Sequence, residues 1–373
     1  MRKRRRFCLY LVIVVVALFV LRDVILTIYP AMFIKKLLTE RDVQNRWKFS
    51  LPPQSLDGTD GILQSKLLGK PLWDVLLYDE LEAAAPVACG TNMLVIMVHS
   101  ATANTQKRNL LRKYYKIYQD LGIFQKLGKV KVLFIIGKDL RPEINDEVSQ
   151  EAKEHQDIIR GNFVDHYFNM TIKNIFGKVK INALCKFKYL LKADDDVFLN
   201  FPVILLNLNK LKENNSRLYL GWPCKGGLFS YPHVFKGRVF QQRLENFNFT
   251  LPDYPFPLAP SYGYGFTYIL SESSVDALVT EYKYIPYIRI IDDFYVAYVL
   301  SRLGIICCET PEFVFEMTEQ RRNEPCYLSD VLTWNFHIET QNDLVQLENV
   351  YMESVRSWTS CINSYTNLLN NYC

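Results

Sequence analysis

The sequence predicts an α/β domain with a mostly parallel sheet and flanking helices. Between positions 93 and 193, four short apolar runs alternate with three longer segments that carry polar residues at helical spacing. Short continuous apolar runs are typical of strands that are buried on both faces, and the alternation indicates strand–helix–strand units. Such units connect parallel strands, and ligands then bind beyond the carboxyl ends of those strands.

The predicted elements follow one another in a regular order. The strands are Met93–Val98, Lys131–Gly137, Asp157–Phe163 and Tyr189–Ala193, and the helices between them are Gln106–Leu121, Glu143–Glu154 and Thr171–Lys188. Gly122 is predicted to end the first of these helices. From Phe201 onward the pattern is less regular and rich in aromatic residues, which suits a substrate-binding half, with one more helix expected over Phe294–Leu303.

The basic charge of the chain lies at its start. The sequence has 44 Lys and Arg against 39 Asp and Glu, and residues 2–6 account for the net charge of +5. The remainder is neutral, which argues against a nucleic-acid binder, because such a protein needs basic residues spread along a groove. A hydrophobic content of 49% and a charged content of 22% rule out a disordered chain.

The N-terminus predicts a membrane anchor. Residues 1–6 would form a cytosolic tail, and residues 7–29 a single signal-anchor transmembrane helix in which Phe7–Leu21 carries no charge. A cleaved signal peptide is the alternative, but no small-x-small cleavage site follows Leu21. The positive-inside rule then places the rest of the chain in the lumen. Residues 30–92 show no sustained period and are predicted to be a stem, and residues 93–373 the lumenal domain.

Cysteines and glycosylation sequences agree with the secretory pathway. Cys8 falls in the predicted anchor, and the eight remaining cysteines are an even number, as an oxidising compartment suggests. Eight cysteines allow 105 pairings, which the sequence leaves open. Asn169, Asn214 and Asn248 each begin an Asn-x-Ser/Thr sequence and are predicted glycosylation sites.

An acidic triplet, Asp194–Asp196, directly follows the fourth predicted strand. Three adjacent carboxylates repel one another unless a cation or hydrogen-bond donors neutralise them. Carboxylate oxygens suit Mg²⁺ or Mn²⁺, especially when substrate phosphates complete the ligand shell. The alternative is a solvated turn. Ser100 and Gly137 follow other strands and are expected at the same edge of the sheet.

Six ordered motifs lie between Met93 and His337, at Ser100–Arg112, Phe134–Gly137, Asp157–Lys173, Cys185–Asn200, Pro260–Ser271 and Asp292–Ala297. Together they resemble the motifs of the β-1,3-galactosyltransferase family (glycosyltransferase family 31). The chain departs from the family pattern at Tyr114, Tyr115, Thr267, Asp292 and Ala297, as a divergent member would. The resemblance implies a GT-A-type, Rossmann-like fold and a type II Golgi membrane enzyme with its catalytic domain in the lumen.

The resemblance also implies a reaction. The expected enzyme is an inverting, Mn²⁺-dependent β-1,3-glycosyltransferase that moves galactose or N-acetylhexosamine from a UDP-sugar to a glycan acceptor on glycoprotein or glycolipid. Asp194 and Asp196 would address the nucleotide and Mn²⁺, with His337 completing the metal shell, and Asp195 would hold the loop of the nucleotide site. His337 could instead be a structural hydrogen-bonding residue. Asp293 would be the catalytic base; its alternative is a first-turn acid of the following helix.

The remaining site residues carry alternatives of their own. Ser100, Arg108 and Arg112 are expected to face the UDP, where guanidinium groups suit phosphate or uracil oxygens. For the two arginines the alternative is a solvated basic face. Tyr262, Gly265 and Asp292 are expected at the acceptor, whereas Tyr262 could equally be a packed core aromatic.

Two other functional classes compete with this expectation. A catalytically degenerate transferase could serve as a lumenal binding protein or chaperone, which the altered motif positions favour and the intact triplet and Asp293 disfavour. A metal-dependent phosphatase or nuclease also uses clustered carboxylates. It predicts phosphoester hydrolysis without an acceptor, and the neutral charge of the lumenal part makes nucleic acid a poor substrate for it.

Overall fold

The computed structural model describes residue 87 and residues 89–211, 217–227, 259–285, 292–324, 326–336, 338 and 340–361. The predicted tail and anchor and nearly all of the predicted stem lie outside these residues, as do His337, Asn214 and Asn248. Within the described ranges, no helix has the combination of length and apolar character that crossing a membrane requires.

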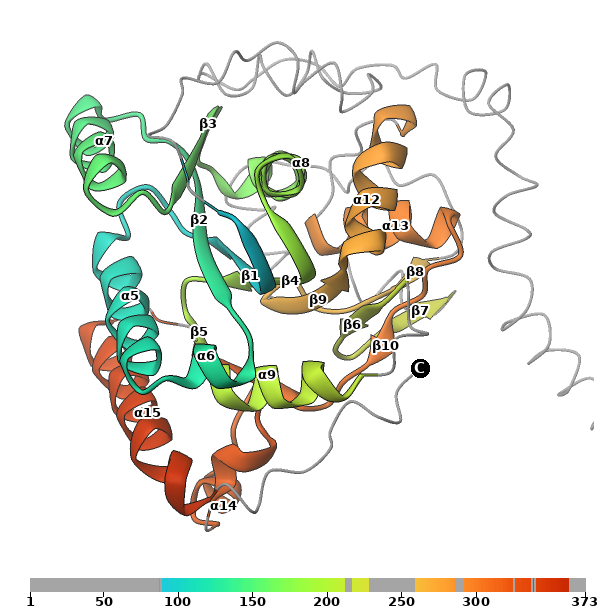
Figure 1. Cartoon of the computed structure of the whole chain (residues 1–373). Coiled ribbons are helices and arrows are strands. Elements are labelled where there is room, and N and C mark those ends of the chain that lie inside the picture. The colour runs from blue at the N-terminus through green and yellow to red at the C-terminus, as the bar shows by residue number, and fades with distance from the viewer. Residues whose placement is uncertain are drawn as a thin grey trace, which may run out of the picture.

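A seven-stranded sheet in the order β10–β6–β9–β4–β1–β2–β3 forms the centre of the described structure (Figure 1). β9 is antiparallel to both of its neighbours, and the other four pairings are parallel. The strands are β1 (Thr91–His99), β2 (Val130–Lys138), β3 (Ile158–Val164), β4 (Lys186–Asp194), β6 (Tyr219–Gly221), β9 (Thr267–Ser271) and β10 (Cys308–Glu309).

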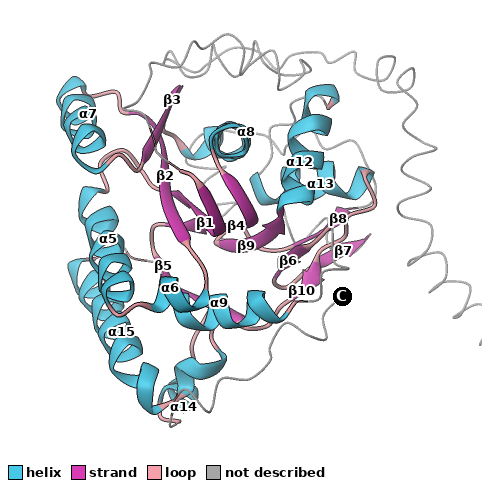
Figure 2. Ribbon diagram, in the orientation of Figure 1, coloured by secondary structure: helices cyan, strands magenta, loops and turns pink. Residues whose placement is uncertain are grey.

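Helices cover both faces of the sheet (Figure 2). One face packs against α5 (Thr105–Asp120), α6 (Ile123–Leu127), α9 (Phe201–Lys210) and α15 (Gln341–Ser360). The other packs against α8 (Met170–Leu184), α12 (Glu272–Glu281) and α13 (Asp292–Arg302), while α7 (Pro142–His155) contributes to the first core at the β3 edge. The minor elements are η1 (Tyr167–Asn169), β5 (Val197–Leu199), β7 (Lys225–Gly227), β8 (Ala259–Tyr262), η2 (Tyr282–Tyr284), β11 (Phe313–Val314), α14 (Glu319–Arg322), η3 (Tyr327–Asp330) and β12 (Thr333–Asn335).

The apolar run of β1 explains this layering. Leu94, Ile96 and Val98 belong to the core on the α5 side, whereas Val95 and Met97 belong to the core on the α8 side. Successive strand residues point to opposite faces, so a strand covered on both faces needs an uninterrupted apolar run. Each such side chain contributes about 1.5–3 kcal/mol on burial.

The parallel register brings three strand ends to one edge of the sheet. His99 at the end of β1 lies opposite Ile135 of β2 and Asp194 of β4. Gly137 near the end of β2 must be a glycine, because a Cβ there would lie 2.6 Å from the carbonyl oxygen of Phe163. The loops after β1, β2 and β4 therefore converge, as expected for Ser100, Gly137 and the acidic triplet at the carboxyl ends of parallel strands.

The four predicted strands and the four predicted helices are confirmed, with shifted ends. The helix predicted to end at Lys188 ends at Leu184, because Cys185 bonds to Cys89 and the next residues form β4. The region after Phe201 is more regular than expected: β6 and β9 extend the main sheet, and α9, α12 and α15 are substantial helices.

The structure gives three of the cysteine pairs that the sequence left open. Disulfides join Cys89 to Cys185, Cys224 to Cys307 and Cys326 to Cys361, and Cys308 is also disulfide-bonded. All cysteines in the described part of the chain are thus oxidised, as is usual in an oxidising compartment.

Candidate active site

The acidic triplet forms the turn between β4 and β5. The backbone N–H of Asp194 donates to the carbonyl of Phe266 at 3.0 Å, which fixes the end of β4 against the start of β9. The Asp194 carboxylate accepts from Nζ of the buried Lys192 at 2.5 Å, and the same ammonium donates to the carbonyl of Gly265. Lys192 therefore joins the triplet to the loop between β8 and β9.

Asp195 turns toward the start of α5. Its Oδ2 accepts from Nδ2 of Asn104 at 2.9 Å, and its Oδ1 lies 3.3 Å from Nζ of Lys107. These contacts hold the turn against the loop after β1, which is the loop-holding arrangement that the sequence suggested for Asp195.

Asp292 and Asp293 occupy the first turn of α13, beside the Lys192–Gly265 contact. Asp293 is 6% exposed, and its Oδ1 accepts from the backbone N–H of Phe294 at 2.7 Å. The backbone N–H of Gly265 also hydrogen-bonds to this carboxyl group. A Cβ on residue 265 would lie 3.2 Å from Oδ2 of Asp293, so glycine leaves room for the carboxylate. The loop after β8 and the start of α13 are therefore built around Asp293.

The carboxyl groups at this site disturb one another. Burial raises the pKa of Asp293 to about 8, and the neighbouring Asp292 adds to that rise. Burial likewise raises the pKa of Asp194 to about 7, with repulsion from Asp196 and Asp292 adding and Lys192 opposing. The Asp194 side chain is nonetheless 33% exposed, so water and ions reach it more readily than they reach Asp293. Acidic groups are therefore crowded at this edge of the sheet, and two of them hold a proton more tightly than an ordinary aspartic acid.

Lys192 responds to these acidic groups in the opposite sense. Burial alone would lower its pKa, but Asp194, Asp292 and Asp293 outweigh burial and raise it above the ordinary value. The lysine thus stays charged among the carboxylates and neutralises part of their charge.

Asp194 and Asp196 fit a divalent cation by their chemistry. They are oxygen donors that repel each other, a situation that a bound cation relieves and that phosphate oxygens can complete. In the described ranges, no group of three or more His, Cys, Asp or Glu side chains is arranged as a metal cluster. The predicted third ligand, His337, lies outside those ranges.

A buried polar network supports the start of α13, and sequence reasoning did not find it. Nδ2 of Asn174 donates to Asp292 and, at 3.0 Å, to the hydroxyl of Tyr268. Nζ of Lys178 donates to Asn174 and, at 2.7 Å, to the same hydroxyl. The available signal was the spacing of Asn174 and Lys178, which are polar residues four positions apart and therefore lie on one face of α8.

Arg108 has a role different from the predicted one. It is fully buried (0% exposed), and its Nε and Nη2 donate to the Glu151 carboxylate at 2.8 and 2.7 Å. Nη1 donates to Oγ of Ser100 at 3.0 Å and to the carbonyl of Ala101 at 2.7 Å. The guanidinium is thus occupied by protein acceptors that shape the loop after β1, and it is neither a free phosphate ligand nor part of a solvated face.

Arg112 is likewise hydrogen-bonded to protein carboxylates. It donates to both Asp157 carboxylate oxygens at 2.8 Å, and to Glu151 at 2.7 Å. The expectation that Ser100, Arg108 and Arg112 face a nucleotide is therefore not met in this structure, in which Ser100 is also buried. All three belong to a polar layer between α5, α7 and β1.

A second buried ion pair ties the strand ends together. Nζ of Lys173 lies 2.8 Å from Oδ1 of Asp165 and donates to the carbonyl of Ser100 at 2.7 Å. Oδ2 of Asp165 accepts from the backbone N–H of Gly137 at 3.1 Å. Both charged residues fall in the motif Asp157–Lys173, but sequence reasoning gave them no role.

Two further predicted residues are buried and support the core. Tyr262, expected at the acceptor, is 7% exposed and packs against Phe294 with ring centroids 5.6 Å apart, as the core alternative proposed. Asn169, a predicted glycosylation site, is 4% exposed and its amide donates to the carbonyl of Val164 at 2.8 Å. This is not the exposed position that a glycan needs.

Comparison with known proteins shows the family of the chain. The sequence model of the galactosyltransferase family matches residues 106–311, which is more than half of the chain. Mouse beta-1,3-galactosyltransferase 1 is 28% identical over 226 residues, covering 59% of this chain and 64% of its own. Beta-1,3-galactosyltransferase brn of Drosophila melanogaster is 25% identical, covering 60% of this chain and 64% of its own.

A third relative matches a shorter segment. Mouse beta-1,3-galactosyltransferase 4 is 33% identical over 126 residues, which cover 32% of this chain and 33% of the relative. The chain thus spans less than two thirds of the length of these curated relatives.

Proposed function

The chain belongs to the galactosyltransferase family, and from this premise we propose that it is an inverting, metal-dependent β-1,3-glycosyltransferase. It would move galactose or N-acetylhexosamine from a UDP-sugar to a glycan acceptor on glycoprotein or glycolipid. The observation that carries the proposal is Asp293, a buried carboxyl group of raised pKa held by two backbone N–H groups next to the acidic turn.

Asp293 is the proposed general base. In a single displacement, the acceptor hydroxyl oxygen forms a bond to the anomeric carbon of the donor while its proton passes to Asp293. The bond from that carbon to the phosphate oxygen breaks, UDP leaves, and the anomeric centre inverts. A carboxylate whose pKa is raised toward neutrality accepts a proton better than an ordinary one. The N–H groups of Phe294 and Gly265 hold this carboxyl group in place.

The acidic turn is the proposed site for the donor diphosphate. Asp194 and Asp196 would hold a divalent cation, with Mn²⁺ the expected ion, and such a cation supplies neutralisation of the departing diphosphate charge. Lys192 and the Asp195–Asn104 contact orient the turn from either side. Because Arg108 and Arg112 are bonded to protein carboxylates, we place the phosphate charge at this turn rather than on these two side chains.

We also propose a type II Golgi membrane protein with this domain in the lumen. Arg2–Arg6 followed by the uncharged segment Phe7–Leu21 supports a signal anchor, and the disulfide-bonded cysteines of the described residues support an oxidising compartment.

The test is a transfer assay on the full-length chain. UDP-galactose, UDP-N-acetylglucosamine and UDP-N-acetylgalactosamine are offered with a glycan panel, in Mn²⁺ and in EDTA, and product linkage is determined. We expect Mn²⁺-dependent transfer that Asp293→Asn abolishes. The matched control, Asp276→Asn, removes an exposed carboxylate of α12 and keeps full activity.

Two outcomes would contradict the proposal. Equal transfer by wild type and Asp293→Asn would remove Asp293 as the base. Calorimetric binding of UDP with no transfer across the panel would support the degenerate binding protein instead.

A further inference from the structure

Two polar side chains of α8 are buried completely. Lys178 and Asn174 are each 0% exposed, and Nζ of Lys178 donates to Oδ1 of Asn174. Nδ2 of the same amide donates to the Asp292 carboxylate at the start of α13. The amide therefore stands between a basic side chain and an acidic one. We call Lys178, Asn174 and Asp292 the α8–α13 bridge.

The two ends of the bridge fix the orientation of the amide. A carboxylate only accepts hydrogen bonds and an amine N–H donates them, so Asn174 has to present Nδ2 to Asp292 and Oδ1 to Lys178. Without an amine at position 178, the amide is free to rotate by half a turn and to place its oxygen against the carboxylate. Burial lowers the pKa of Lys178 and Asp292 opposes this, so the lysine and the carboxylate interact across the amide.

Tyr268 of β9 connects the bridge to the loop that carries Gly265. Its hydroxyl accepts from Nζ of Lys178 at 2.7 Å and from Nδ2 of Asn174 at 3.0 Å. β9 begins at Thr267, two residues after Gly265. The bridge is therefore anchored on the strand that leads out of the loop between β8 and β9.

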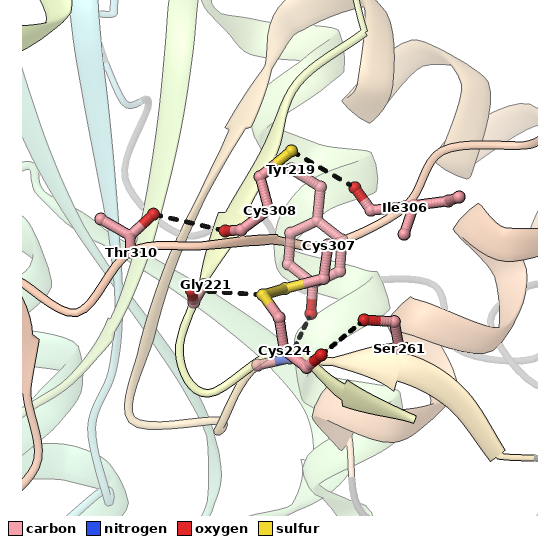
Figure 3. The surroundings of a disulfide bond; sticks show 9 residues. Tyr219, Gly221, Cys224, Ser261, Ile306, Cys307, Cys308 and Thr310 are labelled. Atoms are coloured by element: carbon pink, nitrogen blue, oxygen red, sulfur yellow. Dashed lines mark hydrogen bonds between the residues drawn. A yellow bond between two sulfur atoms is a disulfide. The ribbon is translucent and has the colours of Figure 1, made fainter. Parts of the chain in front are cut away.

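Tyr219 supports the same loop. Its ring lies edge-on to Tyr268, with the ring centroids 5.7 Å apart and 76° between the planes. Its hydroxyl accepts from the backbone N–H of Gly263 at 3.1 Å. Figure 3 shows Tyr219 among the residues that surround the Cys224–Cys307 disulfide. The loop between β8 and β9 is thus held by aromatic side chains that also contact the bridge.

The candidate base lies between the two elements that the bridge joins. Asp292 and Asp293 form the first turn of α13, so the placement of this turn decides where the Asp293 carboxyl group lies. The N–H of Gly265, in the loop between β8 and β9, hydrogen-bonds to the same carboxyl group. Burial raises the pKa of Asp293 most, and the nearby Asp292 adds to the rise. A shift of the bridge therefore changes both the position and the surroundings of the base.

We propose that Asn174 and Lys178 are positioning residues for the base, which act through Asp292 to hold the first turn of α13 in its place beside Gly265. Burying a lysine and an amide lowers stability unless their hydrogen bonds are satisfied, and apolar side chains would fill the same space without that requirement. Asp292 then acts inside the protein and not as a contact for the acceptor. This inference rests on the proposed transferase function, in which Asp293 takes the proton.

The first experiment needs no turnover. Hydrogen exchange of the full-length protein is followed by mass spectrometry in peptides that cover the start of α13, where the Phe294 N–H donates to Asp293. Asn174→Leu keeps the approximate size of the side chain and removes its hydrogen bonds, and it should speed this exchange by about threefold or more. The control, Tyr118→Phe, breaks the buried hydrogen bond to Ser354 between α5 and α15 and should leave exchange in α13 unchanged.

The second experiment measures kinetics with an active donor–acceptor pair. Asn174→Leu should lower kcat about tenfold, because a displaced base stabilises the transition state less, while KM for donor and acceptor stays within about twofold of wild type. Lys178→Met should lower kcat about threefold, since the amide stays but loses its fixed orientation. Tyr118→Phe should keep the wild-type kcat, which separates loss of positioning from the general loss of a buried hydrogen bond.

A double-mutant cycle tests whether Asn174 acts through Asp292. Asn174→Leu combined with Asp292→Leu should lower kcat no further than Asp292→Leu alone, because the second change removes the group on which the amide acts. Losses of kcat that multiply in the double variant would mean that Asn174 acts independently of Asp292 and would overturn the proposal.

The remaining outcomes separate this inference from the function it rests on. Unchanged exchange in Asn174→Leu, or wild-type kcat in both Asn174→Leu and Lys178→Met, would overturn the positioning role while the transferase function stands. Faster exchange in a protein that shows no transfer with any donor–acceptor pair would leave the hold on α13 standing and remove the transferase function. If Asn174→Leu does not fold, kcat of Lys178→Met decides, and a wild-type value overturns the positioning role.

Discussion

Two charged regions of this molecule, one beside the loop after β1 and one at the start of α13, differ in how their charges are met. Around Arg108 and Arg112, guanidinium groups and the carboxylates of Glu151 and Asp157 meet at 2.7–2.8 Å. Around Asp293, carboxyl groups stand beside one another, and their pKa values rise to about 7 and about 8. The first region is neutralised within the protein, whereas in the second the carboxyl groups crowd one another and two of them hold a proton more tightly than an ordinary aspartic acid.

The difference separates a structural polar cluster from a chemical one. Paired groups gain mainly by staying paired, whereas crowded acids are poised to accept a proton or a cation. In the sequence both regions are simply charged residues near strand ends. Changes in the crowded region should therefore affect activity, and changes in the paired region should affect stability.

The largest effect is expected from removing the base. Asp293→Asn keeps the shape of the side chain and removes its capacity to take a proton, so transfer should fall by about 10²–10⁴-fold. Folding should be preserved, because the amide oxygen can still accept from Phe294. Steady-state kinetics together with thermal unfolding of the same preparation measures both. If this variant unfolds, Asp293 is instead a residue that stabilises the fold.

Removing a partner from the region around Arg108 and Arg112 should lower the free energy of unfolding. Arg108→Met leaves Glu151 buried with part of its compensation lost, which should cost about 3–5 kcal/mol in the free energy of unfolding. For a domain of this size that is a fall in Tm of roughly 6–20 °C. The control is Lys116→Met, which breaks the exposed Lys116–Asp120 pair and should change stability by less than about 0.5 kcal/mol. Comparable losses in the two variants would show that burial of the Arg108 pair is unimportant.

A smaller effect on rate is expected at Gly265. In Gly265→Ala the new Cβ would lie 3.2 Å from Oδ2 of Asp293, which must give way by a few tenths of an ångström. A base displaced in this way should lose activity on the order of tenfold, with Tm within a few degrees of wild type. The control is Gly304→Ala. Gly304 has a positive φ and no neighbouring atom within 4 Å of an added Cβ, so this variant introduces backbone strain without changing the position of Asp293. Activity lost equally in both would point to strain.

The smallest effect concerns stability against pH. The folded pKa of Asp293, about 8, lies above that of an unfolded aspartic acid, so the folded state holds a proton that the unfolded state releases. The resulting stability is complete below about pH 4 and is lost as pH rises to about 8. Relative to Asp293→Asn, wild type should therefore lose at most ~1.4 kcal/mol between pH 6 and pH 7.

Denaturant unfolding of the two proteins in EDTA at several pH values measures this difference. A constant gap between wild type and Asp293→Asn would mean that the carboxyl group is ionised in the folded protein across this range.

The sheet between β1 and β4 could be predicted because its strands are buried on both faces. Val95 and Met97 had to be as apolar as Leu94 and Ile96, which makes the run stand out in the sequence. The strands after Phe201 could not be predicted because they are short or pair with segments far along the chain. β6 has three residues and is recognisable as a strand only through its pairing with β9, some fifty residues along the chain.

The acidic turn could be foreseen because adjacent carboxylates are conspicuous, but the partners of single residues could not. No sequence feature near Arg108 identifies Glu151 as its hydrogen-bond partner, because Glu151 lies 43 residues away on α7. Tyr262 and Tyr264 are two positions apart in one loop, and only packing decides that the first is buried and the second partly exposed.

The Cys89–Cys185 disulfide has a mechanical consequence. The bridge lies just before β1 and β4, neighbouring parallel strands in which Thr91 pairs with Lys186. Tension that arrives along the chain from the N-terminal side therefore reaches two central strands at once. Peeling β1 from the edge of its hydrogen-bonded ladder is blocked at the first residue, and the strands would have to shear together instead. A domain pulled from this end should consequently resist extension until the bridge is reduced.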